Sequence, residues 1–210
     1  MKLAFIVDPL DEFKIYKDTS FAMMREAAAR GHSLYACEPR DLLWQRGGKV
    51  SARLRQIALT SDPTAWFTEL EMPSTPLAEL DAVVMRKDPP FDSEYFYATH
   101  LLQQAEREGA RVFNKPAALR DHPEKLAILE WPQFIGATLV TREARAVREF
   151  HAEQRDIILK PLDGMGGMGI FRVGPDGLNL GSIVETLNKG GAETVMVQRY
   201  LTEITQGDKR

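Results

Sequence analysis

Apolar residues in the first half of the chain gather in short continuous runs separated by longer amphipathic stretches. Such runs are typical of strands that are buried on both faces of a parallel sheet. They lie at residues 3–7, 33–37, 81–86 and 111–113. The stretches 21–30 and 93–108 predict helices, each ended by a glycine. This alternation predicts an open parallel α/β sheet for residues 1 to about 120. Residues 42–59 are less regular, with a hairpin turn expected at 46–49.

A different pattern begins after Pro116, where a short helix is expected at 122–130. Shorter segments then follow in the order β-α-β-β-α-β. The strands are expected at 138–140, 156–162, 170–173 and 193–198, and the helices at 142–153 and 178–189. This order predicts a small antiparallel sheet with two helices, which is an α+β domain.

A glycine-rich stretch stands between two of these strands, in the sequence LKPLDGMGGMGIFRV at 159–173. Its glycines match the pattern G-x-G-x-x-G. However, dinucleotide-binding and Walker loops lead into a helix, whereas this stretch leads into β-branched and aromatic residues. It therefore predicts a glycine-rich hairpin whose backbone N–H groups can approach a phosphate, as in kinases. The alternative is a hairpin tip without a function.

Composition and charge narrow the classes of function. The 210 residues are 44% hydrophobic and 27% charged, which is ordinary for a soluble globular protein. The net charge of −3 favours neither nucleic acid nor a membrane surface. The apolar run after Lys2 is too short for a signal peptide, so we expect the cytoplasm. The single cysteine, Cys37, is expected in the core, and the four histidines, which lack metal-ligand spacing, at the surface or at caps.

Five stretches spread over the chain carry a resemblance to a known family. KDTSFAM (17–23), VVMRKDPPFD (83–92), NKPAALRD (114–121), ILKPLDGMGG (158–167) and QGDKR (206–210) together resemble prokaryotic-type glutathione synthetase, an ATP-grasp ligase. The resemblance implies a pre-ATP-grasp α/β domain at 1–121, an ATP-grasp lid subdomain at 122–203, and the start of a C-terminal subdomain at 204–210. We therefore expect a fragment or a truncated product, inactive in this 210-residue form.

The resemblance implies that ATP drives the joining of γ-glutamylcysteine to glycine through an acyl phosphate, in a homo-oligomer. The cofactors would be ATP and Mg²⁺ or Mn²⁺, with the metal ligands expected beyond residue 210. Two other functions stay open, an ATP-binding module without catalysis and a kinase-like phosphotransferase. The phosphotransferase is ranked last because the chain has no H-R-D or D-F-G pattern.

Two lysines are candidate phosphate ligands. Lys160 stands in an apolar strand directly before the glycines, where a buried ammonium group needs an anion to offset its desolvation. Its alternative is a strand-edge lysine that reaches solvent. By residue type, Lys125 is a solvated lysine at the start of a helix, and only the resemblance assigns it to phosphate. The backbone of Gly164, Gly166 and Gly167 is expected to bind phosphate with them.

The resemblance also implies an adenine-binding hinge after the last strand. Its members would be Gln198, Arg199, Tyr200 and Leu201, with Leu201 on the adenine ring and Asp208 on the ribose hydroxyls. A plain domain linker is the alternative. Arg210 would be catalytic, stabilising the tetrahedral transition state or holding the γ-phosphate.

Substrate-binding candidates lie in the first half of the chain. Arg86 ends a core strand, at the edge where open α/β sheets bind ligands, and its guanidinium group suits a carboxylate. A salt bridge from Arg86 to Asp88 or Asp92 has equal weight. Asp18 and Ser20 are the other candidates, although both could serve only to cap the first helix.

Overall fold

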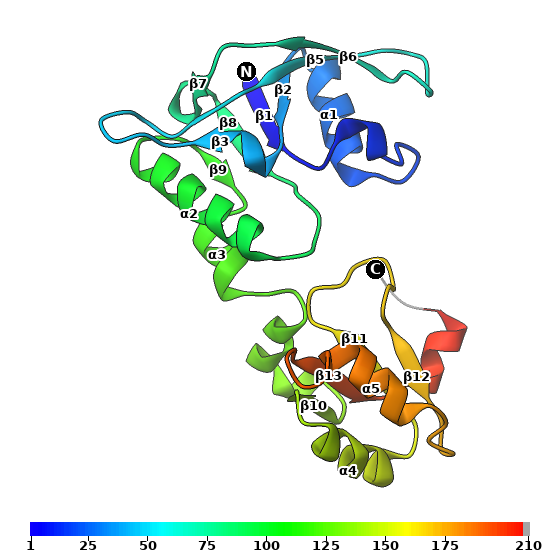
Figure 1. The fold of residues 1–210 in the computed structure, drawn as a ribbon. Coiled ribbons are helices and arrows are strands. Elements are labelled where there is room, and N and C mark those ends of the chain that lie inside the picture. Colours follow the sequence, from blue (N-terminus) through cyan, green and yellow to red (C-terminus); the bar gives the residue numbers. More distant parts are fainter. Residues whose placement is uncertain (208–210) are drawn as a thin grey trace. The chain divides into compact units, whose positions relative to one another are not determined.

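The computed structural model describes residues 1–207. The chain divides into two compact units, Met1–His122 and Pro123–Arg210, called unit 1 and unit 2 below. Figure 1 shows that each unit has its own sheet and its own helices. Unit 1 is an α/β layer structure and unit 2 is a smaller α+β structure, which confirms the predicted fold class. None of the helices in residues 1–207 has the length and apolar character that crossing a bilayer requires.

Unit 1 is built on a six-stranded sheet. Its elements are β1 (Lys2–Ile6), α1 (Thr19–Ala29), β2 (Ser33–Cys37), β3 (Leu42–Leu43), β4 (Ser51–Ala52), β5 (Arg55–Leu59), β6 (Phe67–Glu71), β7 (Thr75–Pro76), β8 (Ala82–Met85), α2 (Ser93–Arg107), β9 (Val112–Phe113) and α3 (Pro116–Asp121). The strand order is β6-β5-β2-β1-β8-β9. Strands β2, β1, β8 and β9 run parallel, as predicted, whereas β5 pairs antiparallel with β2 and β6. The expected all-parallel sheet is therefore a mixed one. The expected turn at 46–49 is confirmed, because it joins the antiparallel pair β3 and β4.

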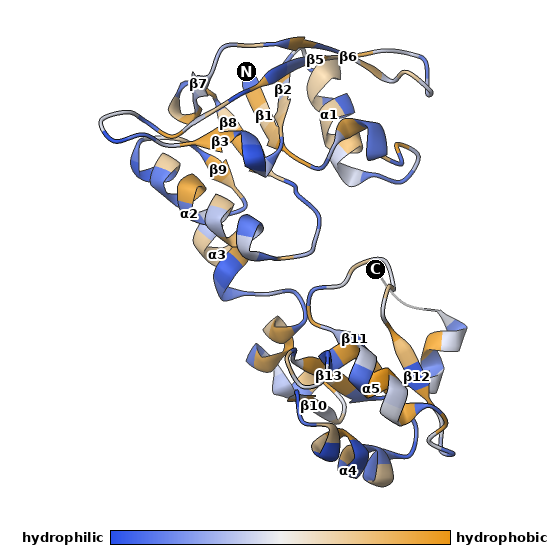
Figure 2. Ribbon diagram, viewed as in Figure 1, coloured by the Kyte–Doolittle hydropathy of each residue, from blue (hydrophilic) through white to orange (hydrophobic). Residues whose placement is uncertain are grey.

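Side-chain alternation along β1 explains why its apolar run is continuous. Ala4 and Ile6 belong to one core cluster, which also contains Leu102 of α2. Phe5 belongs to a second cluster, with Met24 of α1. Because successive side chains of a strand point to opposite faces, the helices α1 and α2 cover the two faces of the sheet. Figure 2 shows hydrophobic residues on β1 and β9 and hydrophilic ones at the turn between β3 and β4.

Cys37 closes β2 inside the first of these clusters and is fully buried, as the sequence predicts. Burial, together with the negative charge of the nearby Asp41 carboxylate, raises the pKa of its thiol to about 12. The thiol is therefore a core group, because the thiolate needed for nucleophilic chemistry is suppressed.

Unit 2 is built on a four-stranded antiparallel sheet. Its elements are the 3-10 helices η4 (Leu126–Glu130) and η5 (Pro132–Phe134), then β10 (Thr138–Thr141), α4 (Ala144–Gln154), β11 (Ile157–Pro161), β12 (Phe171–Val173), α5 (Leu180–Asn188), β13 (Val195–Arg199) and the 3-10 helix η6 (Thr202–Gln206). The strand order is β10-β13-β11-β12. The predicted β-α-β-β-α-β order is confirmed.

The helix expected at 122–130 is wrong as an α-helix. Residues 126–130 form a single 3-10 helix instead, and Pro132 begins a second one. Proline disfavours helical backbone at the residue before it, so Trp131 breaks the segment with a non-helical conformation. The stretch that remains is too short to offset the cost of nucleating an α-helix.

The register of the unit 2 sheet separates an apolar face from a polar one. Ile157, Leu159 and Val197 are buried in one cluster against α4 and α5. Lys160 and Gln198 are the next residues along their strands, so they point to the opposite face. Thr138 pairs directly with Gln198 across β10 and β13 and shares that face.

Candidate functional site

Lys160 lies on β11, directly before the glycine-rich loop. Its Nζ donates a hydrogen bond of 2.7 Å to the side-chain oxygen of Gln198 on β13. Partial burial lowers the pKa of Lys160, and the positive charge of Lys125 lowers it further. Within residues 1–207, no carboxylate forms an ion pair with this ammonium group. A partly desolvated cation that has only a neutral partner is disposed to bind an anion.

Lys125 approaches the same place from the segment before η4. Its Nζ donates to the backbone oxygen of Gly164 over 2.6 Å. The carboxylate of Glu124 stands 3.7 Å away and is largely exposed, whereas the Lys125 side chain is only 13% exposed. Lys125 therefore contacts the first glycine of the loop, and its ammonium group lies near enough to that of Lys160 for its charge to lower the pKa of Lys160. The alternative for Lys125, a solvated helix lysine, is therefore not what this structure shows.

The glycine-rich loop joins two antiparallel strands, as predicted. Leu159 of β11 pairs with Phe171 of β12, so no helix follows the loop. This excludes the dinucleotide and Walker arrangements, in which the loop opens a helix. The amide of Met168 donates to the carbonyl of Met165 over 3.1 Å, which closes a turn inside the loop.

The loop glycines are required for two different physical reasons. Gly166 and Gly167 have φ values of +62° and +82°, which residues with a Cβ rarely adopt. Gly164 is confined by its neighbours instead. A Cβ there would lie 2.9 Å from Cγ of Pro161 and 3.1 Å from the carbonyl oxygen of Met168. Pro161, next to Lys160, thus shapes the base of the loop.

The segment expected to form an adenine hinge leaves the sheet at the end of β13. The backbone N–H of Tyr200 donates to the carbonyl of Asp156 over 2.9 Å. The guanidinium group of Arg172 lies 3.8 Å from the centre of the Tyr200 ring, in cation–π geometry. Arg172 also pairs with Asp156, with its Nη2 2.7 Å from Oδ2, and these hydrogen bonds lower the pKa of Asp156. The side chain of Leu201 is half-exposed.

The other hinge candidates are Arg199 and Gln198, which the structure describes, and Asp208, which it does not. Arg199 closes β13 with an exposed side chain, and its backbone N–H donates to Ala137. The side chain of Gln198 faces Lys160, a contact that the sequence does not predict. Asp208 and Arg210 lie outside the described residues.

In unit 1, Arg86 and Ser20 are brought together as substrate-binding candidates. Nε of Arg86 donates to the hydroxyl of Ser20 over 3.2 Å, and Nη2 donates to the hydroxyl of Thr19 over 2.7 Å. Within the described residues, no ion pair joins Arg86 to Asp88 or Asp92. Instead, the N–H of Asp88 donates to Asp8, and Asp92 caps α2. The salt-bridge alternative for Arg86 is therefore not what this structure shows.

Asp18 is the N-cap of α1. Its carboxylate accepts the N–H of Phe21 over 2.9 Å, which is the capping role that the sequence also offered. Burial raises the pKa of the neighbouring Asp88, and the negative charges of Asp8 and Asp18 add to this effect. The edge beyond β1 and β8 therefore holds mixed charges, including the ion pair of Lys87 with Asp8 at 2.7 Å.

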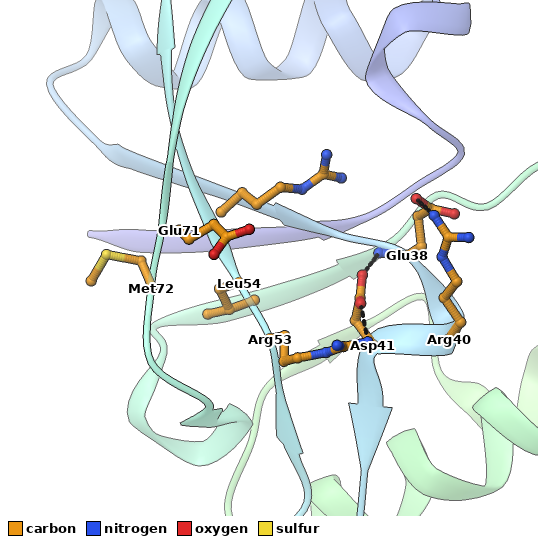
Figure 3. Close-up of a pocket in the computed structure, with 8 residues that line it drawn as sticks. Glu38, Arg40, Asp41, Arg53, Leu54, Glu71 and Met72 are labelled. Atoms are coloured by element: carbon orange, nitrogen blue, oxygen red, sulfur yellow. Dashed lines mark hydrogen bonds and ion pairs between the residues drawn. The ribbon is translucent and has the colours of Figure 1, made fainter.

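A cavity of about 460 Å³ lies elsewhere in unit 1 (Figure 3). It is lined by Glu38, Arg40, Asp41, Arg53, Leu54, Arg55, Glu71 and Met72. Figure 3 shows Asp41 between the backbone of Glu38 and the side chain of Arg53. Each arginine already has a carboxylate partner: Arg40 pairs with Glu38, Arg53 with Asp41, and Arg55 with Glu69. This cavity is therefore lined by ion pairs, each between a more exposed and a less exposed side chain, and the candidate site is the two-lysine cluster of unit 2.

Sequence reasoning missed Thr138, Pro161 and Arg172. The adjacent Lys160-Pro161 pair was a usable signal, because proline before a glycine loop restricts its base. Nothing local marks Thr138 or Arg172, whose roles depend on strand register. Among residues 1–207, no three His, Cys, Asp or Glu side chains are arranged to hold a metal ion.

Several solved structures share the fold of this chain at low sequence identity. A D-cycloserine synthetase matches with a TM-score of 0.59 and 18% identity, covering 97% of this chain and 61% of its own. The D-alanyl-alanine synthetase A of Vibrio cholerae matches with a TM-score of 0.59 and 15% identity, over 96% and 60%. An ATP-grasp RimK domain protein of Sphaerobacter thermophilus matches with 0.57 and 21%, over 96% and 64%. The fold is that of the ATP-grasp class.

Two family models place the chain more closely within that class. Residues 1–120 match the prokaryotic glutathione synthetase N-terminal domain, and residues 124–210 match the prokaryotic glutathione synthetase ATP-grasp domain. The chain belongs to the prokaryotic glutathione synthetase family, which confirms the resemblance carried by its motifs.

Curated relatives agree with this assignment over the whole chain. The glutathione synthetase of Ralstonia nicotianae is 58% identical over 210 residues, and that of Nitrosomonas europaea is 54% identical over 213 residues. That of Pseudomonas aeruginosa is 49% identical over 211 residues. All of this chain is covered in each match, but only 64%, 66% and 66% of the relatives. The chain thus spans about two thirds of their length.

Proposed function

We propose that this chain supplies the substrate-binding and nucleotide-binding parts of an ATP-dependent ligase that joins γ-glutamylcysteine to glycine. The observation that carries the proposal is the pair of neighbouring lysines beside the glycine loop, with Lys125 on the carbonyl of Gly164 and Lys160 within reach of its charge. Both ammonium groups donate their hydrogen bonds to neutral oxygens, and the one carboxylate near Lys125, that of the exposed Glu124, stands 3.7 Å away, so both charges can act on phosphate. Family membership supplies the reaction, because the curated relatives carry the name glutathione synthetase.

The chemistry requires neutralised phosphates and a dry acyl phosphate. A carboxylate oxygen of γ-glutamylcysteine attacks the γ-phosphorus of ATP, and ADP leaves. The amine of glycine then attacks the acyl carbon, loses a proton and expels phosphate. Lys125 and Lys160 are proposed to bind the phosphate oxygens, and the N–H groups of the glycine loop to add further donors. The loop over the phosphates would keep water from the acyl phosphate.

Further roles follow from the same assignment. Residues 198–201 are proposed to bind adenine and Asp208 the ribose, while Arg210 would stabilise charge in the amide-forming step. Mg²⁺ or Mn²⁺ would share the phosphate charge. Family membership suggests that its ligands lie beyond residue 210. We also place the reaction in the cytoplasm, where ATP is available, and expect a homo-oligomer.

In unit 1, Arg86 and Ser20 are proposed to bind a substrate carboxylate. The guanidinium group already contacts two hydroxyls at the N-terminus of α1, and no carboxylate of the described residues occupies it. A helix N-terminus and a guanidinium group both favour a negative charge. Asp18 would then act through the helix, which it caps.

The decisive test removes the charge of Lys160 in the full-length protein. Lys160→Met is expected to weaken ATP binding about 10- to 100-fold, because a hydrogen bond to a charged group is worth about 1.5–3 kcal/mol. Lys189→Met is the matched control, since Lys189 is an exposed lysine of unit 2 that pairs with Glu193. Binding is measured with a fluorescent ATP analogue. ADP release is measured with and without γ-glutamylcysteine and glycine.

Three outcomes separate the alternatives. Release of ADP that needs both substrates and fails in Lys160→Met supports the ligase. Nucleotide binding without substrate-dependent release supports a binding module instead. Equal ATP affinity in wild type and Lys160→Met would show that Lys160 does not bind phosphate.

A further inference from the structure

A chain of side-chain hydrogen bonds crosses three strands and ends on Lys160. The hydroxyl of Thr138 donates to the carbonyl of Gly136 over 2.9 Å. The same hydroxyl oxygen accepts Nε2 of Gln198 over 3.0 Å. Oε1 of Gln198 then accepts Nζ of Lys160 over 2.7 Å. The three side chains come from β10, β13 and β11, which are neighbours in the sheet.

The order of donors and acceptors fixes the orientation of the Gln198 amide. A threonine hydroxyl has one proton, and here that proton goes to Gly136. The hydroxyl can then only accept from Gln198, so the NH₂ end of the amide faces Thr138. The oxygen end must face Lys160, which has donors only. Each hydrogen bond in this series thus determines which end of the next side chain donates and which end accepts.

Sheet register explains how these side chains reach one another. Thr138 and Gln198 form a directly opposed pair, whereas Lys160 is opposed to Met196, two residues before Gln198. Lys160 and Gln198 are therefore diagonal neighbours on one face, within reach of long side chains. All three are partly buried on that face.

We infer that Gln198 and Thr138 are positioning residues, which hold the ammonium group of Lys160 at the base of the glycine loop before the nucleotide arrives. Ordering a lysine side chain costs conformational entropy. When the folded protein already orders the side chain, less conformational entropy is lost as the nucleotide binds. The inference rests on the proposed role of Lys160 as a phosphate ligand.

A neutral acceptor is the chemically suitable partner for this task. A glutamate at position 198 would have a similar shape, but its charge would neutralise the ammonium group and compete with phosphate. An apolar side chain would leave Lys160 free to turn away from the like charge of Lys125. A glutamine avoids both effects, because it supplies an oxygen without a charge. The side chain of Gln198 therefore has a role separate from any contact that its backbone makes with adenine.

The test measures ADP affinity against pH in the full-length protein for Gln198→Met and Gln198→Glu. Both are expected to bind ADP at least severalfold more weakly at pH 7.5. In the wild type, affinity should fall at alkaline pH as Lys160 loses its proton. In Gln198→Met this fall should begin at lower pH, because the acceptor that stabilised the charged lysine is lost. In Gln198→Glu it should begin at higher pH, because a carboxylate favours the charged lysine. A merely structural role would not move the two profiles in opposite directions.

Substitutions of Thr138 test the positioning role independently of Gln198. Thr138→Val removes the hydroxyl at nearly constant volume and should weaken ADP binding severalfold, whereas Thr138→Ser should restore it. Gln154→Met is the control for replacing a glutamine in unit 2, since the side-chain amide of Gln154 donates to the neighbouring Glu153 and, within residues 1–207, to no residue of the lysine cluster. Thermal melting of every variant shows whether it is folded.

The outcomes separate this inference from the proposed function. If Lys160→Met weakens ADP binding but the Gln198 and Thr138 variants match wild type in affinity and pH profile, the positioning role is wrong. If Lys160→Met itself has no effect, the phosphate role of Lys160 fails first. Opposite shifts for Gln198→Met and Gln198→Glu, with rescue by Thr138→Ser, establish the positioning role.

Discussion

Gly177 and His151 form a close contact that determines which residues either position accepts. The backbone N–H of Gly177 donates to Gly174 over 3.0 Å, and its φ is +66°. His151 is buried beside this turn, with Nε2 2.8 Å from the carbonyl of Gly174. The expected surface or capping position of His151 is therefore wrong, and the reason is this buried hydrogen bond. A Cβ on Gly177 would lie 3.2 Å from Cε1 of His151.

Replacing Gly177 by alanine should destabilise the protein by about 1–2 kcal/mol, the cost of left-handed backbone for a residue with a Cβ. The close contact of the new Cβ with the imidazole ring of His151 would destabilise the protein further. Gly181 is the matched control, because it lies in α5 and a Cβ there would meet no heavy atom within 4 Å. Gly181→Ala should stabilise by roughly 0.5–1 kcal/mol. Urea denaturation measures both changes, and a shift of the same sign in both would contradict the account.

At the scale of elements, the β11–β12 hairpin combines an anchored base with an open tip. The base is held by the contact of Lys125 with Gly164 and by Pro161. At the tip, Gly166 and Gly167 are exposed and would meet nothing within 4 Å if they carried a Cβ. Few contacts therefore oppose opening of the tip.

Amide exchange of residues 163–169 should be fast without nucleotide and slow with it. The reason is that backbone N–H groups of the loop are proposed to bind phosphate. Leu159 in β11, which is buried in the sheet, should be protected in both states and serves as an internal reference. Hydrogen-exchange mass spectrometry of the full-length protein gives the measurement. Equal exchange of the loop with and without ATP would refute its role as a lid.

Most elements could be predicted because their pattern is local. The run at 3–7 and the helix after Asp18 need only burial on two faces and a cap. By contrast, β5 and β6 were missed because most of their side chains are exposed or only partly buried, with charged residues such as Arg55 and Glu69. Neither the edge strand β6 nor its neighbour β5 has a continuous apolar run to mark it.

The residues of the candidate site also fall into those that local sequence can predict and those that it cannot. Lys160 and the glycines adjoin one another in the sequence, so their role could be predicted from the sequence. Thr138 lies sixty residues before Gln198, and their contact depends on the register of β10 against β13. Register is decided by the whole sheet, because a slip of one residue would turn each side chain to the other face. Local sequence does not carry this information.

At the scale of the whole molecule, each unit has its own hydrophobic core. Leu159 is fully buried in the cluster of unit 2, and Leu102 is fully buried in a cluster of unit 1. Neither cluster contains a residue of the other unit. The two cores should therefore respond separately to mutation.

Leu159→Ala should lower the stability of unit 2 by about 2–5 kcal/mol, the usual cost of such a cavity. Exchange should then accelerate in β11 and β13, while β1 and β8 keep their protection. Leu102→Ala is the reciprocal control and should accelerate exchange in β1 and β8 alone. If either variant lowered protection in both units to the same extent, the two cores would be one cooperative system.

The burial of Cys37 limits its reaction with small thiols and disulfides. With a pKa of about 12, on the order of one molecule in 10⁵ carries a thiolate there at neutral pH. Thiol–disulfide exchange needs both a thiolate and access to it, and Cys37 offers neither. A protein proposed to bind γ-glutamylcysteine and release glutathione meets a thiol at every turnover. Residues 1–210 contain no second cysteine, so this part of the chain has no sulfur that its own substrate or product can readily capture as a mixed disulfide.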